Sequence, residues 1–350
     1  MPRSRTAAHL SRRGLLAAGG ATALGAVLAA CGSGGGSGSD GTSGSSAKPA
    51  GAGPWSFTDD RKKEVTAKSA PKRVVAYTGT AAALVDFGLD EQIVGVFGET
   101  KTADGKADPT AGDLKVDKVQ ILGNVWGEFG VEKYAALRPE LLVTHMYDPD
   151  ALWYVPDESK DKILGLAPSV AITTARVPMT KPIERYAALA ESLGADLKAK
   201  KVTDAKARFE KAAEELRQAA KAAGGVKVMA CSGSADIFYV SNPKVSTDLM
   251  YFAELGVDIV VPTKLEAGDY FEALSWENAG KFPADLILLD NRSTALQPKD
   301  LAAKPAWGRL PAVKAGQVTP WDAVPRFSYA GAAPLLENLA KAIRNARKVS

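Results

Sequence analysis

The sequence predicts an α/β protein in which two blocks of parallel β-strands flank a long helical segment. Short apolar strands alternate with short helices before residue 174 and again after residue 225, whereas the residues between have a helical pattern. The length of 350 residues suits about two domains of roughly 150 residues each. A content of 46% hydrophobic and 24% charged residues is ordinary for globular proteins and excludes disorder of the whole chain.

The first block begins after Pro71 with an apolar strand and continues as strands and helices in alternation. Gly88 ends the first helix and Pro139 follows the second, since neither residue type continues a helix without cost. This alternation is typical of parallel strands whose faces are covered by helices. We expect strands over 73–77, 93–97, 141–144 and 170–173, and helices over 80–87, 131–137 and 160–166.

The middle of the chain is predicted to form two helices, over 183–193 and 197–223. In the second, apolar residues recur at alternating spacings of three and four from Val202 to Ala223, so one face is apolar and the rest is charged. Its 27 residues give a rod of about 40 Å. This length, and the position between the two blocks, favour a connecting strut over an ordinary helix that covers a core.

The second block repeats the alternation of strands and helices. Gly256 ends its first helix, and a helix with a mixed basic polar face closes the chain. We expect strands over 226–230, 259–261, 286–289 and 317–319, and helices over 247–255, 276–280 and 331–347.

Residues 1–31 are interpreted as a lipoprotein signal peptide rather than as part of the fold. Arg12 and Arg13 precede an apolar run over 15–30, whose 16 residues are fewer than the roughly 20 of a membrane-spanning helix. The run closes with LAAC, which resembles a bacterial lipobox, so we expect lipidation of Cys31. The twin arginine resembles a Tat signal, with Sec export as the alternative; a cleaved secretory signal with an incidental cysteine is the other interpretation.

Residues 32–53 are mostly Gly, Ser, Ala and Thr and predict a flexible linker. The net charge of +4 comes from four arginines in the first thirty residues, since removing them from 44 basic residues leaves 40 against 40 acidic ones. The body of the protein therefore has no basic excess for binding nucleic acid. Cys31 and Cys231 are too few for a disulfide framework.

Four segments carry a resemblance to a known family. Residues 71–76 (PKRVVA) resemble its opening strand, and 131–143 (VEKYAALRPELLV) resemble its next helix–strand segment. Residues 274–287 look like the equivalent segment of a second lobe, and 307–318 (WGRLPAVKAGQV) resemble a later run. The family is that of the substrate-binding lipoproteins of ABC importers for iron–siderophore complexes and cobalamin, and the similarity covers about residues 71–345.

This resemblance implies two Rossmann-like lobes with parallel sheets, joined by one long backbone helix as in class III substrate-binding proteins. It divides the chain into an N-terminal lobe over 54–181, a helical connector over 182–224 and a C-terminal lobe over 225–350. The implied function is that of an extracytoplasmic lipoprotein, anchored to the cell membrane, that captures a ferric siderophore and delivers it to an ABC permease dimer. A cobalamin or haem carrier of the same fold is the alternative.

The resemblance also implies a monomer without catalytic activity, which carries Fe(III) only inside the siderophore complex and has no resident cofactor. An extracytoplasmic two-lobed hydrolase is the rival, but the folded part lacks a Gly-x-Ser-x-Gly elbow and a phosphate-binding Gly-rich loop before a helix. With His9 in the signal peptide, His145 is the remaining histidine, so metal ligation is poorly supported. His145 and Cys231 are interpreted as structural residues.

Ligand-binding residues are expected at the carboxyl ends of the strands, where open α/β sheets bind their ligands. Aromatic rings offer area with a polar edge, and a guanidinium donates several hydrogen bonds to metal-bound oxygens. This composition favours a hydroxamate siderophore, because a triply anionic catecholate complex requires clustered Lys and Arg. The candidates are Tyr77, Trp126, Tyr147, Trp153, Arg176, Tyr239, Tyr270, Phe271, Arg292, Trp321, Arg326, Phe327 and Tyr329.

Among these candidates Arg292 and Arg326 are favoured, because an arginine directly after an apolar strand is seldom part of a core. About half of the aromatic rings are expected simply to fill gaps in the structure. Glu132 and Glu277 occupy corresponding places in the two blocks, each near the start of a short helix. The resemblance implies that they meet arginines of the two permease subunits, although an acid at a helix N-terminus is also favoured by the helix dipole.

Overall fold

The computed structural model describes residues 53–292 and 294–350. The predicted signal peptide, the lipidated Cys31 and nearly all of the predicted linker lie outside the described residues. No helix in the described ranges is long and apolar enough to cross a membrane.

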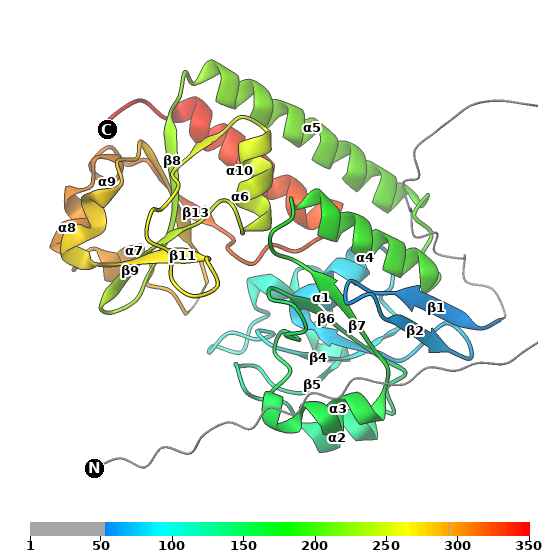
Figure 1. Cartoon of the computed structure of the whole chain (residues 1–350). Coiled ribbons are helices and arrows are strands. Elements are labelled where there is room, and N and C mark those ends of the chain that lie inside the picture. Colours follow the sequence, from blue (N-terminus) through cyan, green and yellow to red (C-terminus); the bar gives the residue numbers. More distant parts are fainter. Residues whose placement is uncertain (1–52, 293) are drawn as a thin grey trace, which may run out of the picture. The chain divides into compact units, whose positions relative to one another are not determined.

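The first sheet has five parallel strands in the order β5-β4-β3-β6-β7 (Figure 1). The strands are β3 (Val74–Tyr77), β4 (Ile93–Phe97), β5 (Gln120–Ile121), β6 (Leu141–Met146) and β7 (Ser169–Thr173). The helices are α1 (Thr78–Asp86), α2 (Val131–Ala136) and α3 (Lys160–Leu166), with 3-10 turns η1 (Pro109–Ala111), η2 (Val116–Lys118) and η3 (Asp157–Ser159). All four strands predicted for this block are confirmed, and β5 is an addition.

An antiparallel hairpin of β1 (Trp55–Thr58) and β2 (Glu64–Ala67) precedes this sheet and was not predicted. The Trp55 and Phe57 rings stack at 6.5 Å, and the Trp55 indole donates a hydrogen bond to Ser192, so the hairpin packs onto the helical layer. Asp59 in the turn between the strands is 1% exposed and pairs with Arg61 at 2.6 Å.

The second sheet has six strands in the order β11-β9-β8-β12-β13, with β10 beside β8. They are β8 (Lys227–Gly233), β9 (Ile237–Ser241), β10 (Asp258–Ile259), β11 (Phe271–Ser275), β12 (Leu286–Asp290) and β13 (Val318–Trp321). The predicted strands of this block are confirmed, and so is the α/β fold class with two separate sheets.

The expectation of purely parallel strands is wrong at one edge of this sheet, because β9 is antiparallel to both β8 and β11. Only residues 234–236 connect β8 to β9, and so short a connection allows a hairpin but not a parallel crossover. Consequently Tyr239 lies inside β9 rather than after a strand, Phe271 begins β11, and Trp321 is the last residue of β13.

The middle of the chain forms α4 (Thr180–Ser192) and α5 (Lys200–Ala222). At 23 residues, α5 is shorter than predicted and begins after a turn in which the Asp196 carboxylate accepts the backbone N–H of Lys198. Such a local bond competes with helix formation, which explains the late start.

The helices of the second lobe are α6 (Thr247–Glu254), α7 (Pro298–Leu301), α8 (Pro305–Arg309), α9 (Pro311–Lys314) and α10 (Tyr329–Asn345). The helix predicted from residue 276 is instead a 3-10 turn, η4 (Trp276–Lys281).

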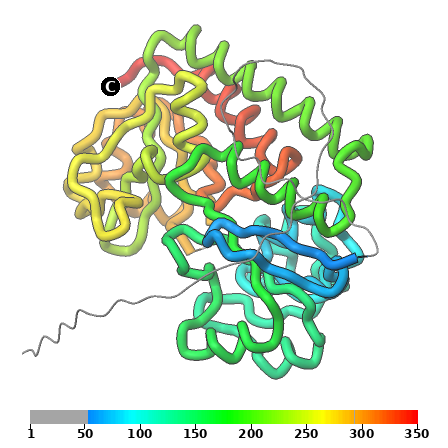
Figure 2. The backbone as a smooth tube through the Cα atoms, turned by 45° about the vertical axis from the view of Figure 1, so that its right-hand side comes forward, coloured from blue at the N-terminus to red at the C-terminus, as the bar shows by residue number. Residues whose placement is uncertain are grey.

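The connecting helix α5 does not stand alone, because α10 lies alongside it (Figures 1 and 2). Arg208 of α5 donates two hydrogen bonds, of 2.7 and 2.6 Å, to the Glu337 carboxylate of α10. After β13 the chain passes back to the first lobe, where the Ser328 hydroxyl bonds to Asp86 at the end of α1, and it returns to the second lobe along α10. The long connecting helix is therefore present as expected, and α10 packs along it as a second brace between the lobes.

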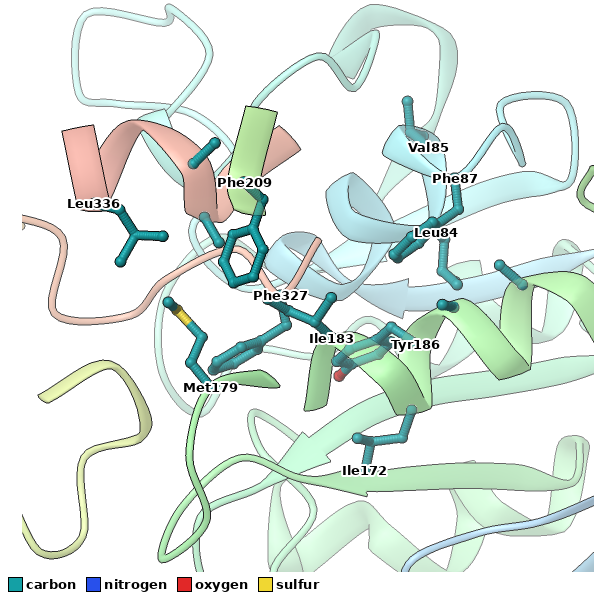
Figure 3. Packing of buried hydrophobic residues seen from close by; sticks show 14 of the residues in the cluster. Leu84, Val85, Phe87, Ile172, Met179, Ile183, Tyr186, Phe209, Phe327 and Leu336 are labelled. Atoms are coloured by element: carbon teal, nitrogen blue, oxygen red, sulfur yellow. The ribbon is translucent and has the colours of Figure 1, made fainter. Parts of the chain in front are cut away.

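One hydrophobic cluster extends from the first sheet, through α4, α5 and α10, to the second sheet. Figure 3 shows its centre, where Phe209 of α5 lies near Leu336 of α10 and the ring of Phe327. Phe327 stacks on Tyr186 of α4 at 6.4 Å between ring centroids. Both lobes therefore share one apolar core on the side of the two helices.

Candidate ligand-binding cleft

A cavity of about 370 Å³ lies between the two lobes. Its first-lobe wall includes Tyr147, which follows β6, and Thr174, which follows β7. Its second-lobe wall includes Asp290 at the end of β12 and Trp321 at the end of β13. The cavity therefore lies at the carboxyl ends of parallel strands from both sheets, as the position rule for open α/β sheets predicts.

Eight of the thirteen predicted ligand-binding residues line this cavity. They come from both lobes and include all but one of the aromatic residues predicted in the second block. They are Tyr147, Trp153, Tyr239, Tyr270, Phe271, Arg292, Trp321 and Phe327.

Three aromatic candidates lie outside the cavity wall. Tyr77 is 1% exposed, with its hydroxyl turned to Glu99, and Trp126 is 64% exposed outside the cavity, where it packs on Trp153 at 4.9 Å. Tyr329 begins α10, which Ser328 caps, and its ring packs on Phe87 and Phe209 at 5.9 and 5.7 Å. The prediction placed them at strand ends or in the loops beside them, whereas the packing of the surrounding elements decides which way each ring points.

Arg176 lies beside the cavity and ties the two lobes together. Its guanidinium donates to the carbonyl oxygen of Tyr147 at 2.9 Å and to that of Gly268, in the other lobe, at 2.8 Å. It also bonds the Tyr270 hydroxyl and pairs with Asp148 at 3.1 Å. Arg176 holds this network in a left-handed backbone conformation, with φ of 60°, a strain that the surrounding bonds must offset.

Arg292 lines the cavity but is already paired. Its Nη2 lies 2.6 Å from Asp290, and its Nε lies within 3.1 Å of both oxygens of the same carboxylate. Hydrogen bonding and the charge of Asp290 outweigh the opposing effect of burial, which is the largest single influence, and hold the pKa of Arg292 above its ordinary value. The side chain is 39% exposed, so part of the guanidinium remains available to a ligand.

Arg326 does not line the cavity, although residues 323–325 and 327 do. Its guanidinium packs onto Gly112, where a Cβ would lie 1.4 Å from Nη1, and it pairs with Asp86 at 3.4 Å. Burial nevertheless raises the pKa of Asp86, against the lowering effects of Arg326 and Ser328. Arg326 is thus a structural residue that joins the strand-to-helix turn before α10 to the first lobe.

We expect Arg326→Ala to lower the free energy of unfolding by about 2–3 kcal/mol, because Asp86 would stay buried without its cation. Ligand affinity should be unchanged, which separates Arg326 from Arg292. Chemical denaturation and ligand titration measure the two effects, with Arg309→Ala on an exposed arginine as the control. A tenfold loss of affinity without loss of stability would contradict this assignment.

Two polar groups in the cavity wall have no hydrogen-bond partner among the described residues. They are the buried hydroxyl of Tyr147 and the buried indole N–H of Trp153. Burial raises the pKa of Tyr147, so this hydroxyl stays protonated and available as a donor. Because buried donors are rarely left unpaired, both groups point to a ligand with oxygen acceptors.

Several acidic residues at the cavity were not predicted. Asp290 follows the predicted strand over 286–289 directly, so the strand-end rule carried enough signal to find it. Asp248, the second residue of α6, is 1% exposed and accepts the Trp321 indole N–H at 2.6 Å. Nothing in the sequence distinguished Asp248 from other acids at helix N-termini, because its burial depends on β13 packing across it.

Direct metal ligation finds no support in the described residues. No group of three or more His, Cys, Asp or Glu side chains within residues 53–292 and 294–350 is arranged to hold a metal ion. His145 is 2% exposed and lies behind the cavity against the rings of Tyr77 and Tyr147, at 4.8 and 5.1 Å. Cys231 is buried in β8, and burial raises the pKa of its thiol.

Glu132 and Glu277, the predicted permease contacts, are both exposed. Glu132 lies in the first turn of α2 and Glu277 in the first turn of η4, one in each lobe. Their exposure is compatible with docking, which stays a prediction.

The chain is similar to many solved structures, among them the following three. DesE, a ferric-siderophore receptor protein from Streptomyces coelicolor, shares 54% sequence identity at a TM-score of 0.81, over 85% of this chain and 100% of that one. Two Bacillus subtilis proteins share 18% identity each: the petrobactin-binding protein YclQ, at a TM-score of 0.63 over 83% of this chain and 99% of that one, and FeuA complexed with ferri-bacillibactin, at 0.61 over 84% and 99%. These two show the fold alone. A search of curated proteins found no match.

The family described as "Periplasmic binding protein" matches residues 74–325, which run from the first strand of the first sheet to the cavity wall after β13. The matched segment includes both sheets and the connecting helix α5. The chain therefore belongs to the periplasmic binding protein family.

Proposed function

We propose that this chain captures a ferric siderophore of the hydroxamate type in the cavity between its lobes and delivers it to the permease of an ABC importer. The observation that carries the proposal is the cavity wall, where aromatic rings stand beside the unpartnered donors of Tyr147 and Trp153. The similarity to DesE, a ferric-siderophore receptor with 54% identity over its whole chain, supports the same ligand class.

The charge of the wall favours hydroxamate over catecholate complexes. Its acidic residues are Asp148, Asp248 and Asp290, and its one basic residue is Arg292. Asp290 pairs with Arg292 and Asp148 pairs with Arg176 beside the cavity, so neither guanidinium is free of a carboxylate. No lysine is among the lining residues. A triply anionic complex would find no unpaired cation among these lining residues, whereas a neutral complex needs none.

Action outside the cytoplasm follows from membership of the family, and the sequence supports a lipid anchor at Cys31 behind a Tat-type signal. Glu132 and Glu277, exposed on the two lobes, are the proposed contacts with the two permease subunits. Reversing the charge at both positions should abolish uptake by cells and leave ligand binding intact.

Quenching of tryptophan fluorescence tests the ligand class directly, because Trp153 and Trp321 both line the cavity. We expect a ferric tris-hydroxamate to bind at least about 100-fold more tightly than a ferric tris-catecholate of charge −3. Cobalamin and haem, titrated in the same way, should cause no saturable quenching.

A cavity-filling variant locates the binding. Ser241→Trp puts an indole into the cavity wall and should abolish quenching by the hydroxamate complex. Ser56→Trp, on the exposed face of the β1–β2 hairpin, is the matched control and should bind as the wild type does. Tighter binding of the catecholate, or binding unaffected by Ser241→Trp, would refute the proposal.

A further inference from the structure

Glu99 places a carboxylate at the same edge of the first sheet as the cavity. β4 ends at Phe97, and Gly98 then turns the chain with a φ of 93°. A Cβ at position 98 would lie 2.5 Å from the Tyr77 ring, so the close approach needs glycine. This turn brings Glu99 to the hydroxyl of Tyr77, which donates to Oε2 at 3.0 Å.

No lysine or arginine of residues 53–292 and 294–350 forms an ion pair with Glu99, which is only partly exposed. Its negative charge nevertheless acts on both walls of the cavity. It contributes to the raised pKa of Tyr147 on one wall and of Arg292 on the other. Arg292 is bound to Asp290, so Glu99 remains a carboxylate near the cavity without a cation of its own.

Aromatic rings surround this carboxylate on the first lobe. Burial, together with hydrogen bonding to Glu99, raises the pKa of Tyr154, whose ring lies 5.4 Å from that of Tyr77. Tyr154 has a φ of 61°, a conformation that a bulky side chain rarely adopts. The Trp126 ring packs against Tyr154 at 5.0 Å and against Trp153, which lines the cavity, at 4.9 Å. It is 64% exposed, which leaves it open to a ligand beside the cavity.

We propose that Glu99, with the rings of Tyr154 and Trp126, forms a subsite for a protonated amine that the siderophore carries outside its iron-binding groups. The inference rests on the proposed function and extends it to the charge of the ligand. A carboxylate pairs with an ammonium group, and the faces of Tyr and Trp attract the same cation. The unpartnered donors of Tyr147 and Trp153 would meanwhile bond to oxygens of the iron centre.

The test compares two probes with the same iron centre: a linear ferric tris-hydroxamate ending in a primary amine, and its uncharged N-acetyl derivative. We expect the wild type to bind the amine form about tenfold more tightly. Glu99→Gln should reduce this ratio to about one and leave the affinity for the N-acetyl form unchanged. Trp126→Ala, at an exposed position, should lower the ratio about threefold.

Glu91→Gln is the matched control, because Glu91 is exposed at the opposite end of β4, and it should keep the full ratio. Equal affinity of the wild type for both probes would overturn the amine subsite and leave the proposed function standing. Equal weakening of both probes by Glu99→Gln would also overturn it, and would instead assign Glu99 a structural role through its hydrogen bond with Tyr77. Failure of both probes to bind would refute the proposed function itself.

Discussion

Asp248→Asn is expected to stabilise the protein at pH 8 by on the order of 4 kcal/mol more than at pH 4. Burial raises the pKa of Asp248 to about 7, and the bonds from Trp321 and from the backbone only partly oppose it. Between its unfolded pKa, near 4, and pH 7, the native carboxyl keeps a proton that the unfolded chain has lost. Stability of the wild type therefore falls as pH rises through this window, and the asparagine removes that loss.

Urea denaturation at pH 4, 6 and 8 measures this effect. The amide oxygen of the asparagine can still accept the Trp321 indole N–H, so the packing at the cavity should survive. Asp258→Asn, at an exposed carboxyl in the same lobe, is the control and should show a much smaller dependence on pH. A constant difference between wild type and Asp248→Asn at all three pH values would show that Asp248 is not buried as a protonated acid.

His145→Phe is expected to protect the protein against acid. Burial lowers the pKa of His145 to about 3, and neither ring nitrogen has a hydrogen-bond partner among the described residues. Between pH 6.5 and 3 the unfolded chain binds a proton that the native imidazole cannot bind, so this residue costs the wild type about 4–5 kcal/mol of stability at the acid end. Phenylalanine, which does not titrate, removes this cost.

Urea denaturation also measures the acid sensitivity due to His145, when the free energies of unfolding of wild type and variant are compared at pH 7 and pH 4. His145→Leu is a second variant that avoids overpacking among the rings of Tyr77, Tyr147 and Phe327. If both variants lose as much stability in acid as the wild type does, the acid sensitivity lies elsewhere.

These two residues oppose each other in the wild type. Between pH 4 and 6.5, the contribution of His145 to the free energy of unfolding rises with pH, whereas the contribution of Asp248 falls. These two contributions nearly cancel each other, so each single variant should change the dependence of stability on pH in the direction opposite to the other. The double variant should return to a pH profile close to that of the wild type.

Much of the fold was predictable, because strand and helix patterns are local. The strands near 74–77, 93–97 and 286–290 appear where apolar runs end at Gly, Pro or polar residues. The β9–β11 edge was missed because its antiparallel pairing is set by the three-residue connection after β8 and not by the composition of the strands.

The residues that line the cavity were predictable only where the end of a strand determines where a side chain lies. Tyr147, Arg292 and Trp321 follow or end strands, and they line the cavity as that rule requires. Arg326 obeyed the same rule but turns toward Asp86, since its direction depends on a buried acid 240 positions away in the sequence. Glu99 went unnoticed for a similar reason, because only the fold brings Tyr77 and Tyr154 to its carboxylate.

The apolar interior common to both lobes affects the kinetics of ligand capture. Bending a pair of packed helices would break the buried contacts between them, so we expect the vacant protein to have nearly the same geometry as the occupied one. The conformational entropy lost in bringing the two cavity walls together is then lost during folding, and not again each time a ligand binds. Association should therefore approach the rate of diffusional collision, and the protein should discriminate among chelates by how long each one stays.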